Sequence, residues 1–233
     1  MSRVHTLSSL SWPQVPPTAL LVVPLGAVEQ HGPHLPLDTD TRIATAAANA
    51  LVTAAPAALL GPAQSYGASG EHQGFAGTVS LGVEALTLLL VELGRSACEW
   101  ATRLLIVNGH GGNAFAVREA VLRLRGEDRD VAWLPCSFPD ADAHAGRTET
   151  SLLLHLAPAV VHLDRAAAGT TAPIGEILGA LRSRGTAAVS ANGVLGDPTG
   201  ASAEEGAELM GGWTAKAVAA LGRWAPDAQG CLR

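Results

Sequence analysis

The sequence predicts an α/β fold, a three-layer α/β/α sandwich with a mainly parallel sheet covered by helices on both faces. Short apolar segments typical of buried strands alternate with longer segments that carry apolar residues at helical spacing. Hydrophobic residues make up 48% of the chain and charged residues 15%, as in a compact protein with a large core. No linker-like run and no internal repeat divides the chain, so we expect one domain over residues 1–233.

The strands are expected where short apolar runs are bounded by turn residues. Residues 19–25 form the first such run, and 58–65, 103–107 and 131–136 form the next three. Residues 75–81 lie between glycines and are expected to form a short strand or one arm of a hairpin.

The helices are expected where apolar residues recur every three or four positions. Leu86, Leu90, Leu93 and Ala97 show this spacing clearly. Proline follows two of the segments and marks where each helix ends. The expected helices are 41–55, 83–101, 114–125, 149–156, 174–184 and 204–224.

Composition excludes several classes of function. A net charge of −6 argues against a nucleic-acid partner, because phosphate binding needs a basic face. Lys216 is the only lysine and lies in the last helical pattern, which argues against Schiff-base chemistry and a phosphate-loop lysine. The three cysteines form no CxxC pair, and the apolar run 18–28 is too short to span a bilayer. We therefore expect a cytoplasmic protein with reduced thiols, no cofactor attached through lysine and no membrane partner.

The segment EQHGPHLPLDTD, residues 29–40, is the richest in chemistry. It places two imidazoles and three carboxylates directly after the first predicted strand. Glu29 and His31 are two positions apart, so in an extended chain they point to the same side. Mixed oxygen and imidazole ligands suit zinc, manganese or iron. The simpler alternative is a loop whose Thr39 or Asp40 caps the next helix, and for Asp38 alone we prefer a purely structural role.

Two further strands lead into similar residues. The strand at 103–107 runs into NGHGGN, which contains His110, and the strand at 131–136 runs into Asp142, His144 and Glu149. The functional loops of a parallel sheet leave the carboxyl ends of its strands. We therefore expect these side chains to meet those of residues 29–40 at one edge of the sheet.

Other chemistries fit less well. Residues 109–114, GHGGNA, match the dinucleotide pattern GxGxxG/A, but the acid that this pattern requires is absent from the end of the following strand. Residues 67–71 lack the final glycine of a serine nucleophile elbow. Cys136 lies late in an apolar strand and is expected to be an inert core residue.

The blocks EQHGPHLPLDTD, NGHGGN and HAGRTETS, in this order and spacing, resemble those of the creatininase family of metal-dependent amidohydrolases. The resemblance spans nearly the whole chain. Within the family the chain is most similar to a subgroup of peptidases, because YGASGEHQGFAGTVS, DADAHAGRTETSLLLH and GVLGDPTGAS match that subgroup.

The resemblance implies a creatininase-like fold and two divalent metal ions: zinc, iron or manganese. Glu29, Asp40 and His110 would hold one ion, and His31, Asp40 and a further carboxylate would hold the second. Creatininase has that carboxylate two residues after the NGH histidine, where this chain has Gly112, so Glu149 is expected to replace it. The resemblance also implies a homo-oligomer, with a hexamer-like arrangement. The loop 137–142 lacks the tryptophan that covers creatinine, which speaks against creatinine as substrate.

Such a site would lower the pKa of a bridging water and polarise an amide carbonyl. His144 is expected to protonate the departing nitrogen, with orientation of a ligand carboxylate as its alternative role. Glu71 and His72 either touch substrate or belong to a solvated loop, and His34 is expected to stabilise its loop. His5, His155 and His162 are expected to be surface or structural residues.

The sequence thus favours a metal-dependent peptidase that cleaves a C-terminal fragment from a modified precursor peptide in redox-cofactor biosynthesis, by attack of a metal-bridging hydroxide. The substrate in this hypothesis comes wholly from the resemblance. One alternative is another amidohydrolase of the same family, acting on a creatinine-like lactam or on a formamide. A second alternative is a non-catalytic nucleotide- or metal-binding module.

Overall fold

The computed structural model describes residues 6–17 and 19–233. Its strands form one parallel sheet in the order β2-β1-β3-β4. The four strands are β1 (Leu20–Leu25), β2 (Ala58–Leu60), β3 (Arg103–Asn108) and β4 (Val131–Pro135). The central pair runs in register from Leu20 opposite Arg103 to Leu25 opposite Asn108. The predicted parallel sheet is confirmed.

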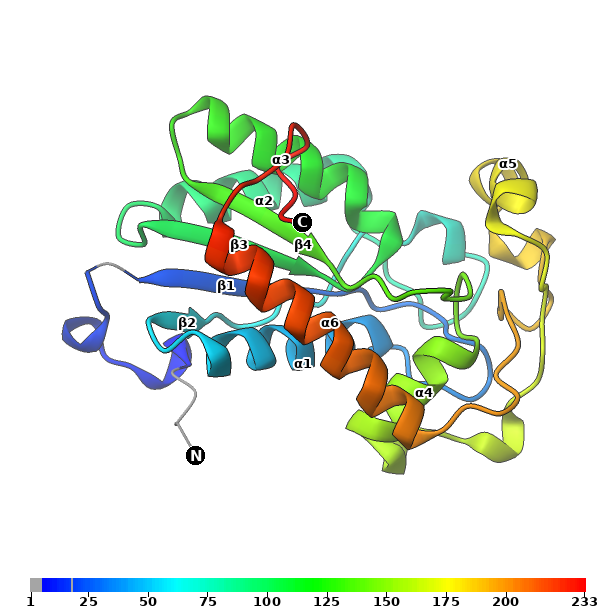
Figure 1. Cartoon of the computed structure of the whole chain (residues 1–233). Coiled ribbons are helices and arrows are strands. Elements are labelled where there is room, and N and C mark those ends of the chain that lie inside the picture. The colour runs from blue at the N-terminus through cyan, green and yellow to red at the C-terminus, as the bar shows by residue number, and fades with distance from the viewer. Residues whose placement is uncertain (1–5, 18) are drawn as a thin grey trace.

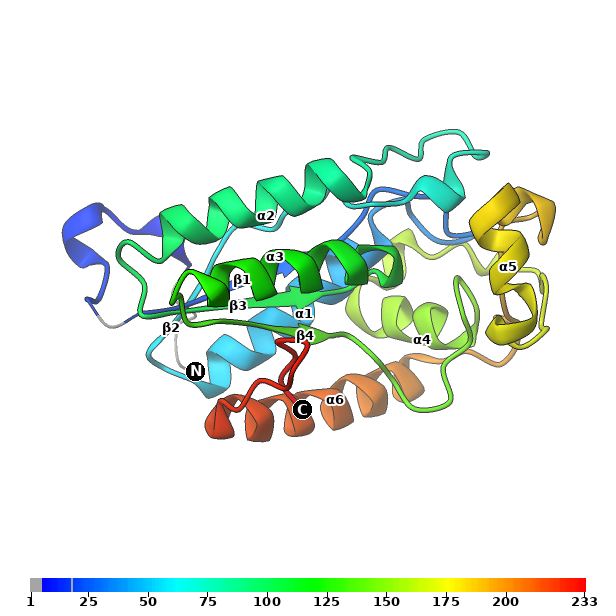
Figure 2. The same ribbon diagram turned by 90° about the horizontal axis from the view of Figure 1, so that it is seen from above.

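Helices cover both faces of the sheet, as Figures 1 and 2 show. One face carries α2 (Val83–Ala97) and α3 (Ala114–Gly126), which pack against each other. The other carries α1 (Thr39–Ala54), α4 (Arg147–Leu156) and α6 (Ala203–Arg223). The remaining helix, α5 (Ile174–Arg184), lies beyond the carboxyl ends of the strands (Figure 1). The expected three-layer sandwich is therefore confirmed.

Each face of the sheet has its own hydrophobic core because successive side chains of a strand point to opposite faces. Val22 and Leu105 pack with α1, α4 and α6, whereas Leu21 and Leu104 pack with α2 and α3. Leu105 and Leu104 are both fully buried. Burial of one such side chain stabilises the fold by about 1.5–3 kcal/mol, so the two cores hold the strand ends firmly in place.

Three elements differ from the sequence prediction. β2 ends at Leu60 instead of residue 65, because an extra residue breaks the register there: Gly61 donates to Val22 O at 2.8 Å, and the next bond is from Gln64 to Pro24 O at 2.9 Å. Residues 75–81 form no strand, and there Val79 makes only an isolated bridge to Val28. α2 ends at Ala97 instead of residue 101, because the chain turns there to enter β3.

The C-terminal segment covers the exposed edge of β4. Trp133 donates its N–H to Gly230 O at 3.1 Å and accepts from Leu232 N at 2.9 Å. This pairing satisfies backbone groups that an edge strand would otherwise leave open. Among the described residues, no helix is long and apolar enough to cross a membrane.

Candidate metal centre

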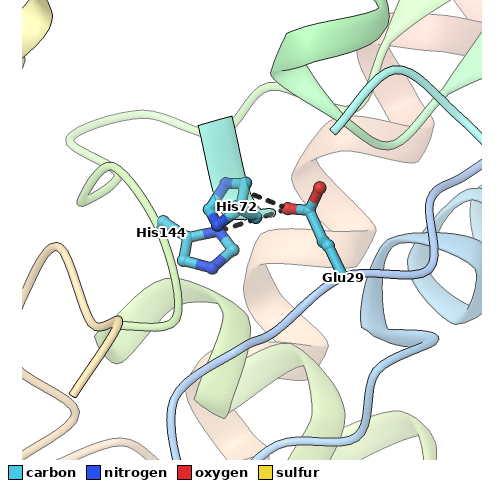
Figure 3. Close-up of side chains that lie close together, drawn as sticks. All are labelled: Glu29, His72 and His144. Atoms are coloured by element: carbon cyan, nitrogen blue, oxygen red, sulfur yellow. Dashed lines mark ion pairs between the residues drawn. The ribbon is translucent and has the colours of Figure 1, made fainter. Parts of the chain in front are cut away.

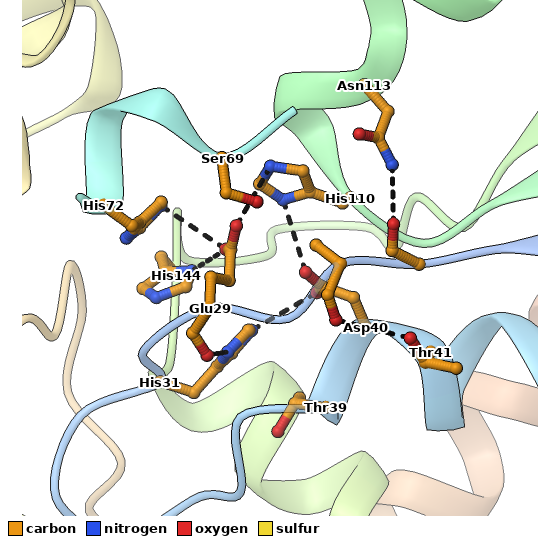
Figure 4. Close-up of polar contacts among 12 residues, drawn as sticks. Glu29, His31, Thr39, Asp40, Thr41, Ser69, His72, His110, Asn113 and His144 are labelled. Carbon is orange, nitrogen blue, oxygen red and sulfur yellow. Dashed lines mark hydrogen bonds and ion pairs between the residues drawn. The ribbon is translucent and has the colours of Figure 1, made fainter. Parts of the chain in front are cut away.

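The loop after β1 delivers the first three polar side chains to a buried site at the carboxyl edge of the sheet (Figure 4). Glu29 and His31 come from the loop itself, and Asp40 comes from the first turn of α1. Glu29 and His31 are 0% exposed and Asp40 is 2% exposed. His31 Nε2 lies 3.2 Å from Asp40 Oδ1. Buried charges of this density need partners of opposite charge.

The loop after β3 adds His110. Its Nε2 lies 3.1 Å from Glu29 Oε2 and its Nδ1 lies 3.3 Å from Asp40 Oδ2. Gly109 makes this approach possible, because a Cβ at that position would lie 2.4 Å from Asp40 O. Asn113 fixes the loop, accepting from Ala68 N at 2.7 Å and donating to a neighbouring backbone carbonyl. Sequence reasoning assigned no role to this asparagine.

The loop after β4 adds His144 and Glu149. Glu149 Oε2 accepts from Ala145 N at 2.6 Å and lies 3.6 Å from His31 Nε2. Asp142, two residues before His144, caps α4 by accepting from the backbone N–H groups of Arg147 and Thr148. Because Asp142 performs the capping, the carboxylate of Glu149 is left to face His31.

Two histidines converge on a single oxygen of Glu29 (Figure 3). His72 Nε2 lies 3.4 Å from Glu29 Oε1, and His144 Nδ1 lies 3.7 Å from the same atom. The ring of His144 lies between two others, with its centroid 4.3 Å from that of His31 and 4.4 Å from that of His72. The sequence left the location of His72 open, and the structure places it in the buried site at 4% exposure.

The hydrogen bonds of Gln30 determine which nitrogen of each histidine carries a proton. The side-chain oxygen of Gln30, Oε1, accepts from Gly32 N, which fixes the orientation of the amide. The side-chain nitrogen of Gln30 then lies 3.0 Å from Gly193 O and 2.9 Å from His72 Nδ1, and it donates to both. His72 Nδ1 therefore accepts, and its proton is on Nε2. His144 Nε2 lies 2.7 Å from Gln30 O and must donate to it. The lone pair of His144 is then on Nδ1, facing Glu29.

The charges of the site influence one another strongly. Burial alone would lower the pKa of His31. The negative charges of Asp40 and Glu149 outweigh burial and raise this pKa to about 10. Burial likewise opposes the charged form of His110, whose pKa Glu29 and Asp40 raise to about 10. Burial raises the pKa of Glu29 to about 7. The pKa of Asp40 stays well below its usual range, because His31 and His110 outweigh the effect of its burial.

The donor atoms fit bound cations. Both oxygens of Glu29 and Oδ2 of Asp40 are buried without a hydrogen-bond partner. The His144 lone pair also faces a carboxylate oxygen, an arrangement that a cation between them would stabilise. Within the described residues, three groups place their ligand atoms within 4.8 Å of one another: Glu29, His31 and Asp40; His31, His144 and Glu149; and Glu29, His72 and His144. His110 belongs to none of these groups, although it contacts both Glu29 and Asp40.

The site lies in a cavity of about 1750 Å³ that Asp40, His110, His144 and Glu149 line. Glu71 also lines it, with Oε1 3.8 Å from His110 Nε2 and a side chain 32% exposed. Glu71 is therefore at the border between the buried site and the open cavity.

The remaining polar residues of the sequence motifs lie outside this site. His34 Nε2 contacts Thr150 Oγ1 at 2.9 Å and so links its loop to α4. His155 and His162 are exposed, and His5 lies outside the described residues. Burial raises the pKa of Cys136 well above its usual range, which keeps this thiol protonated and unreactive.

Comparison with known proteins agrees with this geometry. The family model described as creatinine amidohydrolase matches residues 8–221. The chain belongs to the creatininase family. A mycofactocin precursor peptide peptidase of Mycobacterium ulcerans is 52% identical over 240 residues, covering 100% of this chain and 95% of the relative. A protein of the same name from Mycolicibacterium smegmatis is 55% identical over 218 residues, covering 91% and 88%.

Solved structures of creatininase share the fold. A creatininase variant in a Zn–Zn form superimposes with a TM-score of 0.82 at 26% identity, covering 97% of this chain and 100% of the other. Membership of the creatininase family confirms the resemblance seen in the three motifs and makes the chain a metal-dependent hydrolase of C–N bonds.

Proposed function

We propose that this creatininase-family protein is a peptidase that cleaves a C-terminal fragment from the modified mycofactocin precursor peptide. The observation that carries the proposal is the buried set of Glu29, His31, Asp40 and His110, with the partly buried Glu149, beside a cavity of about 1750 Å³. Its unpaired carboxylate oxygens suit cations, and the cavity has room for several residues of a peptide. The two relatives named as mycofactocin precursor peptide peptidases support this substrate.

We assign Glu29, Asp40 and His110 to one divalent ion and His31, Asp40 and Glu149 to a second, with Asp40 shared. Both histidines contact the carboxylates of their proposed sets at 3.1–3.6 Å. Zinc, iron and manganese all accept this mixture of oxygen and nitrogen ligands. When bound, two such ions would lower the pKa of water and polarise the amide carbonyl.

Side chains of the protein would carry out the proton transfers of the reaction. His144 Nδ1 carries a lone pair, so it can take up a proton and deliver it to the departing nitrogen. Burial and the nearby His31 and His72 lower the pKa of His144, which favours prompt release of that proton. His72 holds its proton on Nε2, which faces Glu29 Oε1 at 3.4 Å.

A creatinine-like lactam fits the cavity poorly as substrate. Of the described aromatic side chains, only Phe115 lines it, and that side chain is 55% exposed. The loop after β4 contributes Pro139 and Asp140 to the lining instead of an aromatic cover for a small ring. The size and polarity of the cavity favour a longer peptide.

Mass spectrometry of the reaction products tests the proposal. Purified protein loaded with zinc, iron or manganese should release a C-terminal fragment from the modified precursor peptide, and the chelated protein should not. Release of ammonia or a ring-opened lactam, with the peptide intact, would favour the other amidohydrolase activities. Elemental analysis of the same samples gives the identity and number of the ions, and light scattering tests the expected homo-oligomer.

A further inference from the structure

A second cavity, of about 770 Å³, lies beside the first. Residues of α3, β4, α5 and α6 and of the C-terminal segment form its walls. Four basic side chains line it, and within the described residues no Asp or Glu does. These basic side chains are Arg118, Arg182, Lys216 and Arg233. In a chain of net charge −6, this is an unusual concentration of positive charge.

The first cavity has the opposite character. Seven carboxylates line it against three arginines, Arg147, Arg182 and Arg184. The seven are Asp40, Glu71, Asp140, Asp142, Glu149, Asp197 and Glu205. An anionic group would therefore meet repulsion in the outer part of the first cavity and attraction in the second.

Two of the four basic side chains are available for a ligand. Arg118 already contacts Glu119 at 3.2 Å, and Arg233 contacts Asp227 at 2.8 Å. Arg182 and Lys216 are exposed, and neither forms an ion pair with any described residue. Their charges are not neutralised by the protein itself.

Most of the remaining wall of the second cavity is apolar, and two tryptophans contribute to it. Trp133 donates its indole N–H to Gln229 O at 3.0 Å, and Trp213 donates to Pro135 O at 2.9 Å. Because both indole donors are used, the rings are held in place and offer apolar surface. Exposed cations together with fixed aromatic rings suit an extended peptide with acidic side chains, whose methylene groups can pack on the rings.

The two cavities are neighbours. Ala114, Phe115 and Arg182 line both of them, so a chain lying across the start of α3 would contact both. We propose that the second cavity binds an acidic segment of the peptide substrate, N-terminal to the segment held over Asp40. This proposal rests on the proposed peptidase function and explains how a long peptide would be placed with its C-terminal part at the metal centre.

Fluorescence anisotropy with a labelled oligoglutamate peptide tests the binding itself. The metal-loaded protein should bind this peptide more tightly than the same peptide with Gln in place of Glu, and salt should weaken binding. The double variant Arg182→Gln/Lys216→Gln should bind the oligoglutamate roughly tenfold more weakly, since each exposed ion pair contributes modestly. The matched control Arg123→Gln/Arg165→Gln removes the same charge outside both cavities and should bind as wild type.

Equal binding of the two peptides, or equal loss in both double variants, would overturn the proposal. If the Arg182→Gln/Lys216→Gln protein has a smaller mass by light scattering, the cavity is an interface between copies and the proposal is also wrong.

Cleavage assays separate this inference from the peptidase function. With cleavable peptides that differ only in their N-terminal segment, acidic or neutral, the acidic one should have the lower KM. The double variant should remove this difference in KM between the two peptides. Equal KM values with normal cleavage would refute the acidic subsite alone. Absence of cleavage of every peptide, with oligoglutamate still bound, would refute the peptidase function alone.

Discussion

His72 and His144 present opposite hydrogen-bonding characters to the same oxygen of Glu29. His72 directs an N–H at Oε1 and His144 directs a lone pair, at 3.4 and 3.7 Å. Both assignments depend on Gln30, which donates to His72 through its amide and accepts from His144 at its backbone carbonyl. One residue thereby sets the proton positions of two rings that are separate in sequence.

We predict that histidine nitrogen NMR of the metal-free protein will show His72 protonated at Nε2. In Gln30→Glu a carboxylate replaces the donor amide, so the proton of His72 should move to Nδ1 while His144 keeps its backbone bond. Gln64→Glu is the matched control, because the amide of Gln64 donates only to Tyr66 O. An unchanged His72 spectrum in Gln30→Glu would show that Gln30 does not set this tautomer.

Asp40→Ala should bind clearly less metal than wild type. Loss of a shared carboxylate removes a bond to both ions and leaves their mutual repulsion unscreened. Asp38→Ala is the control: Asp38 is two residues away, is 42% exposed and pairs only with Arg42. Elemental analysis after dialysis measures the difference, and circular dichroism checks folding. Two ions per chain in Asp40→Ala would contradict the bridging assignment.

Glu149→Gln and Asp142→Asn should have different effects. Asp142 caps α4, so its substitution should lower the free energy of unfolding by about 0.5–2 kcal/mol and leave metal content intact. Glu149 faces His31, so its substitution should abolish turnover and weaken metal binding with little thermal change in metal-free protein. Denaturation curves and metal titrations compare the two variants. Near-normal turnover in Glu149→Gln would mean that another acid supplies the carboxylate ligand of the second ion.

His144→Gln should lower kcat on an amide substrate by about 10²–10⁴-fold, the usual contribution of positioned proton transfer. An activated anilide or ester needs no protonation of its leaving group and should be much less affected. Metal content should stay close to that of wild type. Equal losses on amide and ester together with metal depletion would instead make His144 a metal ligand, consistent with its place in two of the ligand groups.

The free energy of unfolding of metal-free protein should fall as pH rises from 7 to 9. The pKa values of His31 and His110 are raised to about 10 in the folded chain, so the folded state retains protons that the unfolded state loses near pH 6.5. Their stabilisation is complete below pH 6.5 and is lost as pH approaches 10. Urea denaturation in chelator measures this decline. His31→Gln should flatten it, whereas the exposed His155→Gln should not.

The sequence by itself determined the layers of the fold and the edge at which the site lies. Buried strands need apolar side chains on both faces, and this pattern is visible in the run from Leu20 to Leu25. Parallel strands bring their carboxyl ends to one edge, so the locations of Glu29, His110 and His144 followed from topology alone. The end of β2 was harder to predict, because an extra residue between Gly61 and Gln64 breaks the register in a run that otherwise reads as strand.

Only the tertiary structure decided how those side chains divide their roles. Gln30, His72 and Gly193 come from three distant segments, and their hydrogen bonds depend on loop conformations that no local pattern encodes. The same holds for Arg182 and Lys216, on α5 and α6, which border one cavity although neither belongs to a motif. Periodicity reports which face of an element is buried, whereas hydrogen bonds and charge environment depend on atoms that folding brings together from far along the chain.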